Sequence, residues 1–340
     1  MMYPNTLFSI LIFVSTLFMA WFILLRITPW FIKITRERGW LGKDMNKSDK
    51  REVSELGGIP VYIGFVTSIM FALVIYYLFC FYQYSFIDIT KLVLIFITIS
   101  LMMFIGFMDD ILGWKKGISQ LQHFIYPLIF SIPMVIFAII YHLNSIYIPG
   151  FGVLQLGLIY AWILIPIAID ATTNSFNLLA GFNGLEAGIS VIIFTTIAII
   201  SFVRGEITLL IILAAWIGAL LGFLEFNKYP SKIFPGDIIT LVSGVLAGIS
   251  AIVLKLEFLI AFLILLYIIE FIIKASYRFK TECFGIPNKN GLLRANPKGG
   301  SLTHVILKLG KGKLTEKKLV LTFYLIQLVI SLFALFFFFF

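Results

Sequence analysis

Three groups of acidic and amide residues stand at the ends of long apolar segments. Asp109 and Asp110 close one such segment in the sequence GFMDD, and Asp237 opens another in FPGD. Between them, Asp170 precedes a stretch rich in asparagine that includes Asn177 and Asn183. Ionisable residues at the ends of membrane segments are costly, so these groups are candidates for function.

The chemistry that these residue types favour is phosphoryl transfer. Carboxylate and amide oxygens, without a cluster of His and Cys, suit Mg²⁺ rather than Zn²⁺. Nearby Lys and Arg would hold the remaining phosphate charge, and an aspartate pair could orient a phosphate nucleophile or accept its proton. Phosphoryl transfer needs positioning and charge neutralisation more than covalent chemistry. The sequence has no Walker glycine loop or kinase signature, so a nucleotide site must be built differently.

Each group also has a purely structural interpretation. An aspartate pair can cap a membrane span, and an Asn- and Gly-rich stretch is often a turn. Asp237, which follows Pro235-Gly236, could be a helix N-cap. The chemical interpretation is favoured because all three groups fall on the same predicted side of the membrane.

The elements that must position these groups are membrane-spanning helices. Of the 340 residues, 61% are hydrophobic and 13% are charged, whereas soluble domains carry about 25% charged residues. The apolar runs are long enough to cross ~30 Å of hydrocarbon as helices. We therefore expect an all-α polytopic membrane protein, residues 1–340 forming a single domain, with a kink at Pro127 and Pro133. The ten expected spans are 7–32, 58–81, 92–108, 120–140, 153–170, 186–203, 207–224, 238–254, 257–279 and 319–340.

The basic residues indicate which ends of these spans face the cytoplasm. Of the 26 Lys and Arg residues, 22 fall in the first, third, seventh and ninth loops. The opposite loops hold Lys91, Arg204 and Lys255, and Arg26 lies inside the first span. Positive residues stay cytoplasmic, so the odd-numbered loops and the polar groups are predicted inside and both termini outside. The net charge of +9 is therefore a topology signal, and no nucleic-acid partner is expected.

The motifs resemble those of the polyprenyl-phosphate N-acetylhexosamine-1-phosphate transferase family. They are most similar to the eukaryotic and archaeal branch that makes GlcNAc-diphospho-dolichol. The resemblance extends from about residue 39 to 313, with the motifs in family order. They are GWLGKDMNK, SELGGIP, GFMDD, TNSFNLLAGFNGLEAG and FPGD, of which the long asparagine motif is the most specific.

The resemblance implies roles for individual residues. Asn177 and Asp237 would ligate Mg²⁺, Asn183 would contact the uracil, and Phe234 would stack on it. Glu55 falls where the branch has an active-site glutamate.

Asp109 and Asp110 match the catalytic carboxylates of the family. Neighbouring residues on a helix point about 100° apart, so the two are expected to differ in role. We assign Asp110 to the lipid phosphate and Asp109 to its support.

The sequence departs from the family pattern at the expected phosphate contacts. Gly113 and Ser119 stand where the family often has Asn and Lys, with Lys115 and Lys116 as possible substitutes. In the last cytoplasmic loop, residues 283–285 replace an Arg-His-Arg sequence, for which Arg294 or Lys289 could compensate.

The resemblance implies transfer of GlcNAc-1-phosphate from UDP-GlcNAc to dolichyl or another polyprenyl phosphate, with release of UMP. This would be the first step of lipid-linked oligosaccharide assembly for N-glycosylation. The expected membrane is an archaeal plasma membrane, or the endoplasmic reticulum in a eukaryote, and a homodimer is a family expectation.

Two alternatives stay open. A bacterial-type enzyme would use undecaprenyl phosphate and another UDP-sugar. It is disfavoured because Ala180 and Asn183 replace its aspartates and because the last loop holds one histidine, His304. An ion-coupled transporter would show inverted repeats, and none is seen.

The topology can be tested by cysteine-accessibility labelling in intact cells. We expect single cysteines near Lys43 to be protected from an impermeant reagent and those near Tyr147 to be labelled, because Lys and Arg concentrate in the odd-numbered loops. Labelling near Lys43 with protection near Tyr147 would invert the topology.

Overall fold

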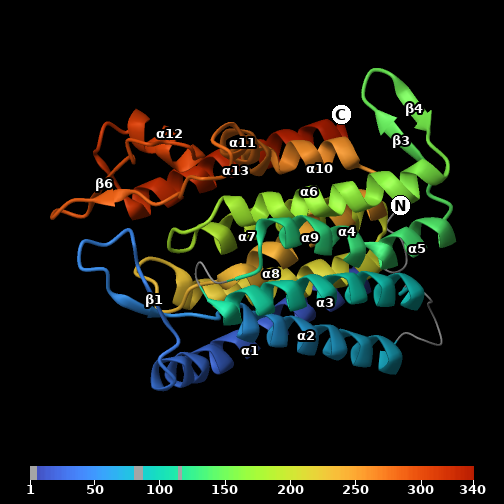
Figure 1. The fold of residues 1–340 in the computed structure, drawn as a ribbon. Helices are drawn as coiled ribbons and strands as arrows, with labels where there is room; N and C mark the ends of the chain where they lie inside the picture. The colour runs from blue at the N-terminus through green and yellow to red at the C-terminus, as the bar shows by residue number, and fades with distance from the viewer. Residues whose placement is uncertain (1–5, 80–86, 114–116) are drawn as a thin grey trace.

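The computed structural model describes residues 6–79, 87–113 and 117–340, and most of its regular structure is helical. The long helices lie side by side in one bundle (Figure 1). In chain order, the helices of all lengths are α1 (Thr6–Glu37), α2 (Gly58–Phe79), α3 (Ile89–Leu112), α4 (Gln120–Phe130), α5 (Ile132–Ile140), a π-helix η1 (Tyr160–Leu164), α6 (Ile165–Leu178), α7 (Leu185–Arg204), α8 (Ile207–Asn227), α9 (Gly236–Leu254), α10 (Glu257–Leu263), α11 (Leu265–Ser276), α12 (Leu302–Leu309) and α13 (Glu316–Phe339).

Short strands lie at the two ends of this bundle. An antiparallel hairpin joins β1 (Leu41–Lys43) and β2 (Glu52–Ser54), and a three-stranded sheet joins β5 (Ile286–Pro287), β6 (Leu292–Arg294) and β7 (Leu314–Thr315). Both lie at the same end, together with α12 (Figure 1). The hairpin of β3 (Ser145–Ile148) and β4 (Gly152–Gln155) lies at the opposite end.

The prediction of an all-α polytopic membrane protein is confirmed. Within the described ranges, eight helices are long and apolar enough to cross a membrane, and a ninth span is counted if α10 and α11 are taken together. These two helices meet at Ile264 with a bend of 73°, which was not predicted. The fifth expected span corresponds to η1 and α6 and is not among these nine, and α6 carries Asp170 and Asn177.

The predicted start of the fifth span was wrong. Residues 153–155 belong to β4, which pairs with β3 across a turn where Gly150 and Gly152 have positive φ. The helix ends later than expected, at Leu178, and within it the hydroxyls of Thr172 and Ser175 donate hydrogen bonds to carbonyls one turn back. Most of the asparagine motif is therefore helical. The expected kink in the fourth span is an interruption at Ser131, between α4 and α5.

The helices α8 and α9 form the centre of the bundle. In their most apolar 18-residue windows, 83% and 89% of the residues are buried, compared with 28% in α1. A helix that is apolar on all sides and buried on all sides is surrounded by other helices. The large apolar side chains on the outer faces of α1 and α13 are exposed, as lipid contact requires.

Glycines allow the central helices to approach their neighbours closely. A Cβ at Gly218 of α8 would lie 2.2 Å from the carbonyl oxygen of Leu17 on α1. On α9, a Cβ at Gly244 would lie 2.6 Å from the carbonyl oxygen of Thr172 on α6. Small residues spaced four apart, as at Gly218 and Gly222, are typical of helix contacts in membranes.

We expect Gly218→Ala to destabilise the bundle, because its new methyl group meets a backbone atom that cannot move without shifting α1. Overpacking of this kind costs about 1–3 kcal/mol, which should lower the apparent melting temperature in detergent. Val14→Ile is the matched control, since it adds one methylene on the exposed face of α1. Equal melting temperatures for the two variants would show that this contact is not tight.

Candidate functional site

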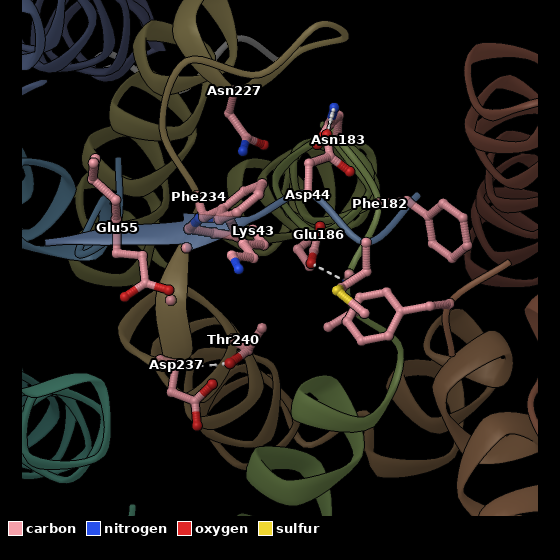
Figure 2. Close-up of a pocket in the computed structure, with 18 residues that line it drawn as sticks. Lys43, Asp44, Glu55, Phe182, Asn183, Glu186, Asn227, Phe234, Asp237 and Thr240 are labelled. Atoms are coloured by element: carbon pink, nitrogen blue, oxygen red, sulfur yellow. Dashed lines mark hydrogen bonds between the residues drawn. The ribbon is translucent and has the colours of Figure 1, made fainter. Parts of the chain in front are cut away.

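A cavity of about 510 Å³ lies at the end of the bundle that carries β1 and β6. It is formed by the β1–β2 segment, the turn between α6 and α7, and the turn between α8 and α9 (Figure 2). Four residues predicted from the sequence line it: Glu55, Asn183, Phe234 and Asp237. These four residues, which are distant in sequence, therefore share one site, and Asp109, Asp110 and Asn177 lie beside Asp237 outside the lining.

Backbone hydrogen bonds hold Phe234 and Glu55 on one wall. The N–H of Phe234 donates to Ser54 at 2.8 Å, and its carbonyl accepts from Gly57 at 3.0 Å. Glu55 follows directly, with its carboxylate against Gly42, where a Cβ would lie 2.2 Å from Oε1. Burial raises the pKa of Glu55 above its ordinary value.

Asp110 binds the N-terminus of α9. Its Oδ1 accepts from the backbone N–H of Asp237 at 2.7 Å, and its Oδ2 accepts from that of Ile238 at 3.4 Å. The first N–H groups of a helix lack partners within the helix and favour an anion. Gly236, which precedes them with a φ of +68°, gives Asp110 the space to approach, since a Cβ there would lie 2.4 Å from Oδ2.

Asp109 has different neighbours. Its Oδ1 accepts from the backbone N–H of Ile118 at 2.6 Å and lies 3.6 Å from Nε2 of His123 on α4. One ligand atom each of Asp109, His123 and Asp237 lies within 4.8 Å of the others. His123 was not predicted, because a single histidine in an apolar helix carries no signal until folding places it beside a carboxylate.

Asn177 and Asp237, predicted as a pair, lie in contact. The Asn177 Nδ2 donates to Oδ2 of Asp237 at 3.1 Å, and its Oδ1 accepts from the Thr240 hydroxyl at 3.0 Å. Together with Asp109, they offer two carboxylates and an amide. Such hard oxygen donors fit Mg²⁺, which takes one or two carboxylates and completes its shell with water and phosphate.

The opposite wall is built around Asn183. Its Nδ2 donates to Oδ2 of Asp44 at 3.1 Å, and its backbone N–H donates to Glu316 at 2.8 Å. Glu186 of the same motif accepts from the backbone N–H of Gly181 at 2.6 Å, and its other oxygen is buried without a hydrogen-bond partner among the described residues. Asp44 and Glu186 lie in motifs that the sequence singled out, yet their roles were not predicted.

Lys43 is the single cation among the described residues that line the cavity. Its amine points into the space between Glu55, Glu186 and Asp237 (Figure 2). It forms no hydrogen bond or ion pair within the described part of the chain. The lining otherwise carries four carboxylates, those of Asp44, Glu55, Glu186 and Asp237.

The remaining predicted residues are not placed in the cavity. Arg294 lies exposed on β6, outside the lining, and Lys289 lines a separate cavity of about 190 Å³. Lys115 and Lys116 lie outside the described residues. Asp170 lies outside the lining and accepts from Asn174 at 2.8 Å.

The segment that replaces Arg-His-Arg is apolar and packed into the fold. Phe284 lines the cavity, and the backbone N–H of Gly285 donates to Asn46 at 3.0 Å. Cys283 is buried, which raises the pKa of its thiol, and it donates to the carbonyl of Leu178 at 3.2 Å. This segment therefore supplies no cation to the cavity.

Comparison with known proteins finds relatives that match most of the chain. Residues 92–255 match the model of glycosyl transferase family 4. A candidate UDP-N-acetylglucosamine–dolichyl-phosphate N-acetylglucosaminephosphotransferase of Sulfolobus acidocaldarius is 35% identical over 319 residues, which cover 91% of each chain. The protein of the same name from Saccharolobus solfataricus is 33% identical over 308 residues, covering 89% of this chain and 90% of that one.

A bacterial relative is also similar along its length. The phospho-N-acetylmuramoyl-pentapeptide-transferase of Borrelia hermsii is 30% identical over 355 aligned positions, covering 96% of this chain and 93% of that enzyme. The similarity to these three proteins extends over about nine-tenths of the chain or more, and it confirms the resemblance seen in the motifs. The chain belongs to glycosyl transferase family 4.

Proposed function

We propose that this protein transfers GlcNAc-1-phosphate from UDP-GlcNAc to dolichyl phosphate or a related polyprenyl phosphate. The products are UMP and GlcNAc-diphospho-dolichol, the first lipid-linked sugar of N-glycan assembly. Two relatives named for this reaction match about nine-tenths of the chain. The observation that carries the proposal is that Asp109, Asp110 and Asn177 meet at Asp237, which lines a cavity whose other walls offer an aromatic ring and an amide.

The donor set supports a bound Mg²⁺. Asp237 and Asn177 would hold the ion, with Asp109 beside them, and the ion would neutralise the diphosphate charge as the bond to UMP breaks. Asn177 now donates to Asp237 through Nδ2, but rotation of the amide by 180° would turn Oδ1 toward the same ion. Without a metal ion, the four carboxylates of the lining would repel a diphosphate, because a single lysine cannot balance their charge.

The two ends of the donor substrate would bind different walls. The uracil would stack on Phe234 and contact Asn183, as the family resemblance implies. Lys43, the unpaired cation of the lining, would bind the diphosphate. This assignment gives Lys43 the part that Arg294, Lys115 and Lys116 were expected to share.

The reaction exchanges one phosphorus–oxygen bond for another. An oxygen of the lipid phosphate forms a bond to the phosphorus that bears GlcNAc, and the bond from that phosphorus to the bridging oxygen breaks. UMP leaves with that oxygen. The site's task is to place the two phosphates in line and to neutralise their charge.

The contacts favour roles for the two aspartates that are the reverse of those assigned from the sequence. Asp110 uses both carboxylate oxygens to hold the N-terminus of α9, and so it positions Asp237. Asp109 lies beside Asp237 and His123 and would orient the lipid phosphate or accept its proton. Asp110 is then the supporting residue.

The proposed reaction is tested by UMP release from the purified protein with a panel of UDP-sugars and polyprenyl phosphates. We expect UDP-GlcNAc with dolichyl phosphate to give the highest kcat/KM. A preference for UDP-N-acetylmuramoyl-pentapeptide and undecaprenyl phosphate would instead assign the bacterial reaction.

We expect Asp237→Ala and Asn177→Ala to abolish UMP release while the protein remains folded and inserted, because each removes a proposed Mg²⁺ ligand. Mg²⁺ should raise the melting temperature of the wild type with UMP but not that of the variants. Asp170→Asn, which alters a carboxylate outside the cavity, is the control. Near-normal turnover of either alanine variant at saturating Mg²⁺ would show that its residue is not a ligand.

The aspartate pair is tested by two single substitutions to Asn, which keep the shape and remove the charge. We expect Asp109→Asn to lower kcat by about 10²–10⁴-fold, the usual range for a general base, with little change in UMP affinity. Asp110→Asn should lower the melting temperature as well, because it weakens the cap of α9. Normal turnover in both variants would show that the two aspartates have a structural role and not a catalytic one.

A further inference from the structure

The cavity contains an amide whose orientation is set by a charged neighbour. Asn183 is 5% exposed and Asp44 is 3% exposed, and the Nδ2 of Asn183 donates to Oδ2 of Asp44 at 3.1 Å. Asn183 lines the cavity, and no described residue donates to its Oδ1. Asn183 therefore has one side-chain atom engaged with Asp44 and one available to a ligand.

Asp44 can act toward Asn183 only as a hydrogen-bond acceptor. A carboxylate only accepts hydrogen bonds. Its Oδ1 accepts from the backbone N–H of Asn46 at 3.1 Å, and its Oδ2 lies 3.2 Å from the Lys47 ammonium. Lys47 also pairs with Glu316 and lies 4.4 Å from the ring centroid of Tyr229.

Asn183 is held from a second direction by the same ion-pair network. Its backbone N–H donates to Oε1 of Glu316, while Oε2 of Glu316 pairs with Lys47. Lys47 and Glu316 are 7% and 2% exposed. The first loop, the turn after α6 and the start of α13 thus fix both the position and the orientation of this amide.

We propose that Asp44 is a positioning residue that determines nucleobase selectivity. By accepting from Nδ2, it obliges Asn183 to present Oδ1, an acceptor, to the base. The inference rests on the proposed function, in which the base is a uracil beside Asn183.

The two pyrimidines differ at the atom that this acceptor would meet. Uracil carries an N–H donor at N3, whereas N3 of cytosine is an acceptor. Uracil would complete a hydrogen bond to Oδ1, and cytosine would face it with a second acceptor. A buried polar atom left unpaired costs more free energy than a hydrogen bond gains, so the pair Asp44–Asn183 disfavours cytosine.

The test is calorimetric titration of the purified full-length protein in Mg²⁺ with UMP and with CMP. We expect the wild type to bind UMP at least roughly tenfold more tightly than CMP. In Asp44→Asn, the new amide can accept or donate a hydrogen bond, so the side-chain amide of Asn183 can rotate by about 180°. The ratio of the Kd values for CMP and UMP should then approach one. Asp49→Asn, the same change at an exposed position of the same loop, should keep the wild-type ratio.

A merely structural role for Asp44 would give a different result. Asp44→Asn would then weaken UMP and CMP by the same factor, and this outcome would overturn the proposal, as would a wild type that binds both nucleotides equally. Asp44→Ser provides the same readout if Asp44→Asn fails to fold, because a hydroxyl also accepts or donates. UMP-selective binding without UMP release from UDP-GlcNAc would contradict the proposed reaction alone.

Discussion

The contact between the Asp110 carboxylate and the N-terminus of α9 is the interaction on which the rest of the site depends. It joins α3 to α9 at the point where Asp237 enters the cavity. Two glycines permit it, because a Cβ at Gly106 would lie 2.7 Å from the backbone nitrogen of Ile238 and one at Gly236 would meet Asp110 itself. The position of Asp237, and hence its distance from Asp109 and Asn177, follows from this approach.

A second set of contacts holds the β1–β2 segment, which forms the wall of the cavity beside the proposed position of the base. The β1–β2 segment carries few apolar residues to anchor it, and its hold on the bundle comes from polar contacts instead. The side chain of Asn46 donates to the carbonyl of Gly181 at 2.7 Å and accepts from Gly285 at 3.0 Å, and Lys47 pairs with Glu316. A buried ion pair contributes little net stability but specifies one arrangement when its partners are all satisfied. A single arrangement of this kind is what the proposed recognition of the base requires.

The charge balance of the cavity explains why its walls must be rigid. Carboxylates gathered around one lysine repel one another, and they are kept in place by backbone donors and by the packing of α8 and α9 behind them. The proposed binding of Mg²⁺ would offset part of the negative charge of these carboxylates. Binding of the proposed ligands would therefore stabilise the site.

The sequence by itself determined the fold class, the positions of most spans and the identity of several of the residues that meet at the site. Long apolar runs can only be helices in a membrane, and carboxylates or amides at their ends are visible one by one. Asn177 and Asp237 were paired through their motifs, and they lie in contact. The pairing of β3 with β4 and the bend at Ile264 were not predicted, because each depends on local turns within segments that are apolar enough to be spans.

Only the tertiary structure decided which side chains face one another. His123 gained its place beside Asp109 when α4 packed near α3, and Lys43 became the cation of the lining although Arg294 has the same charge and lies outside it. The link from Asp44 to Asn183 spans 139 residues, and the roles of the two aspartates depend on the backbone of α9. Sequence pattern records residue type and helix phase, whereas these contacts arise from how separate helices and loops pack.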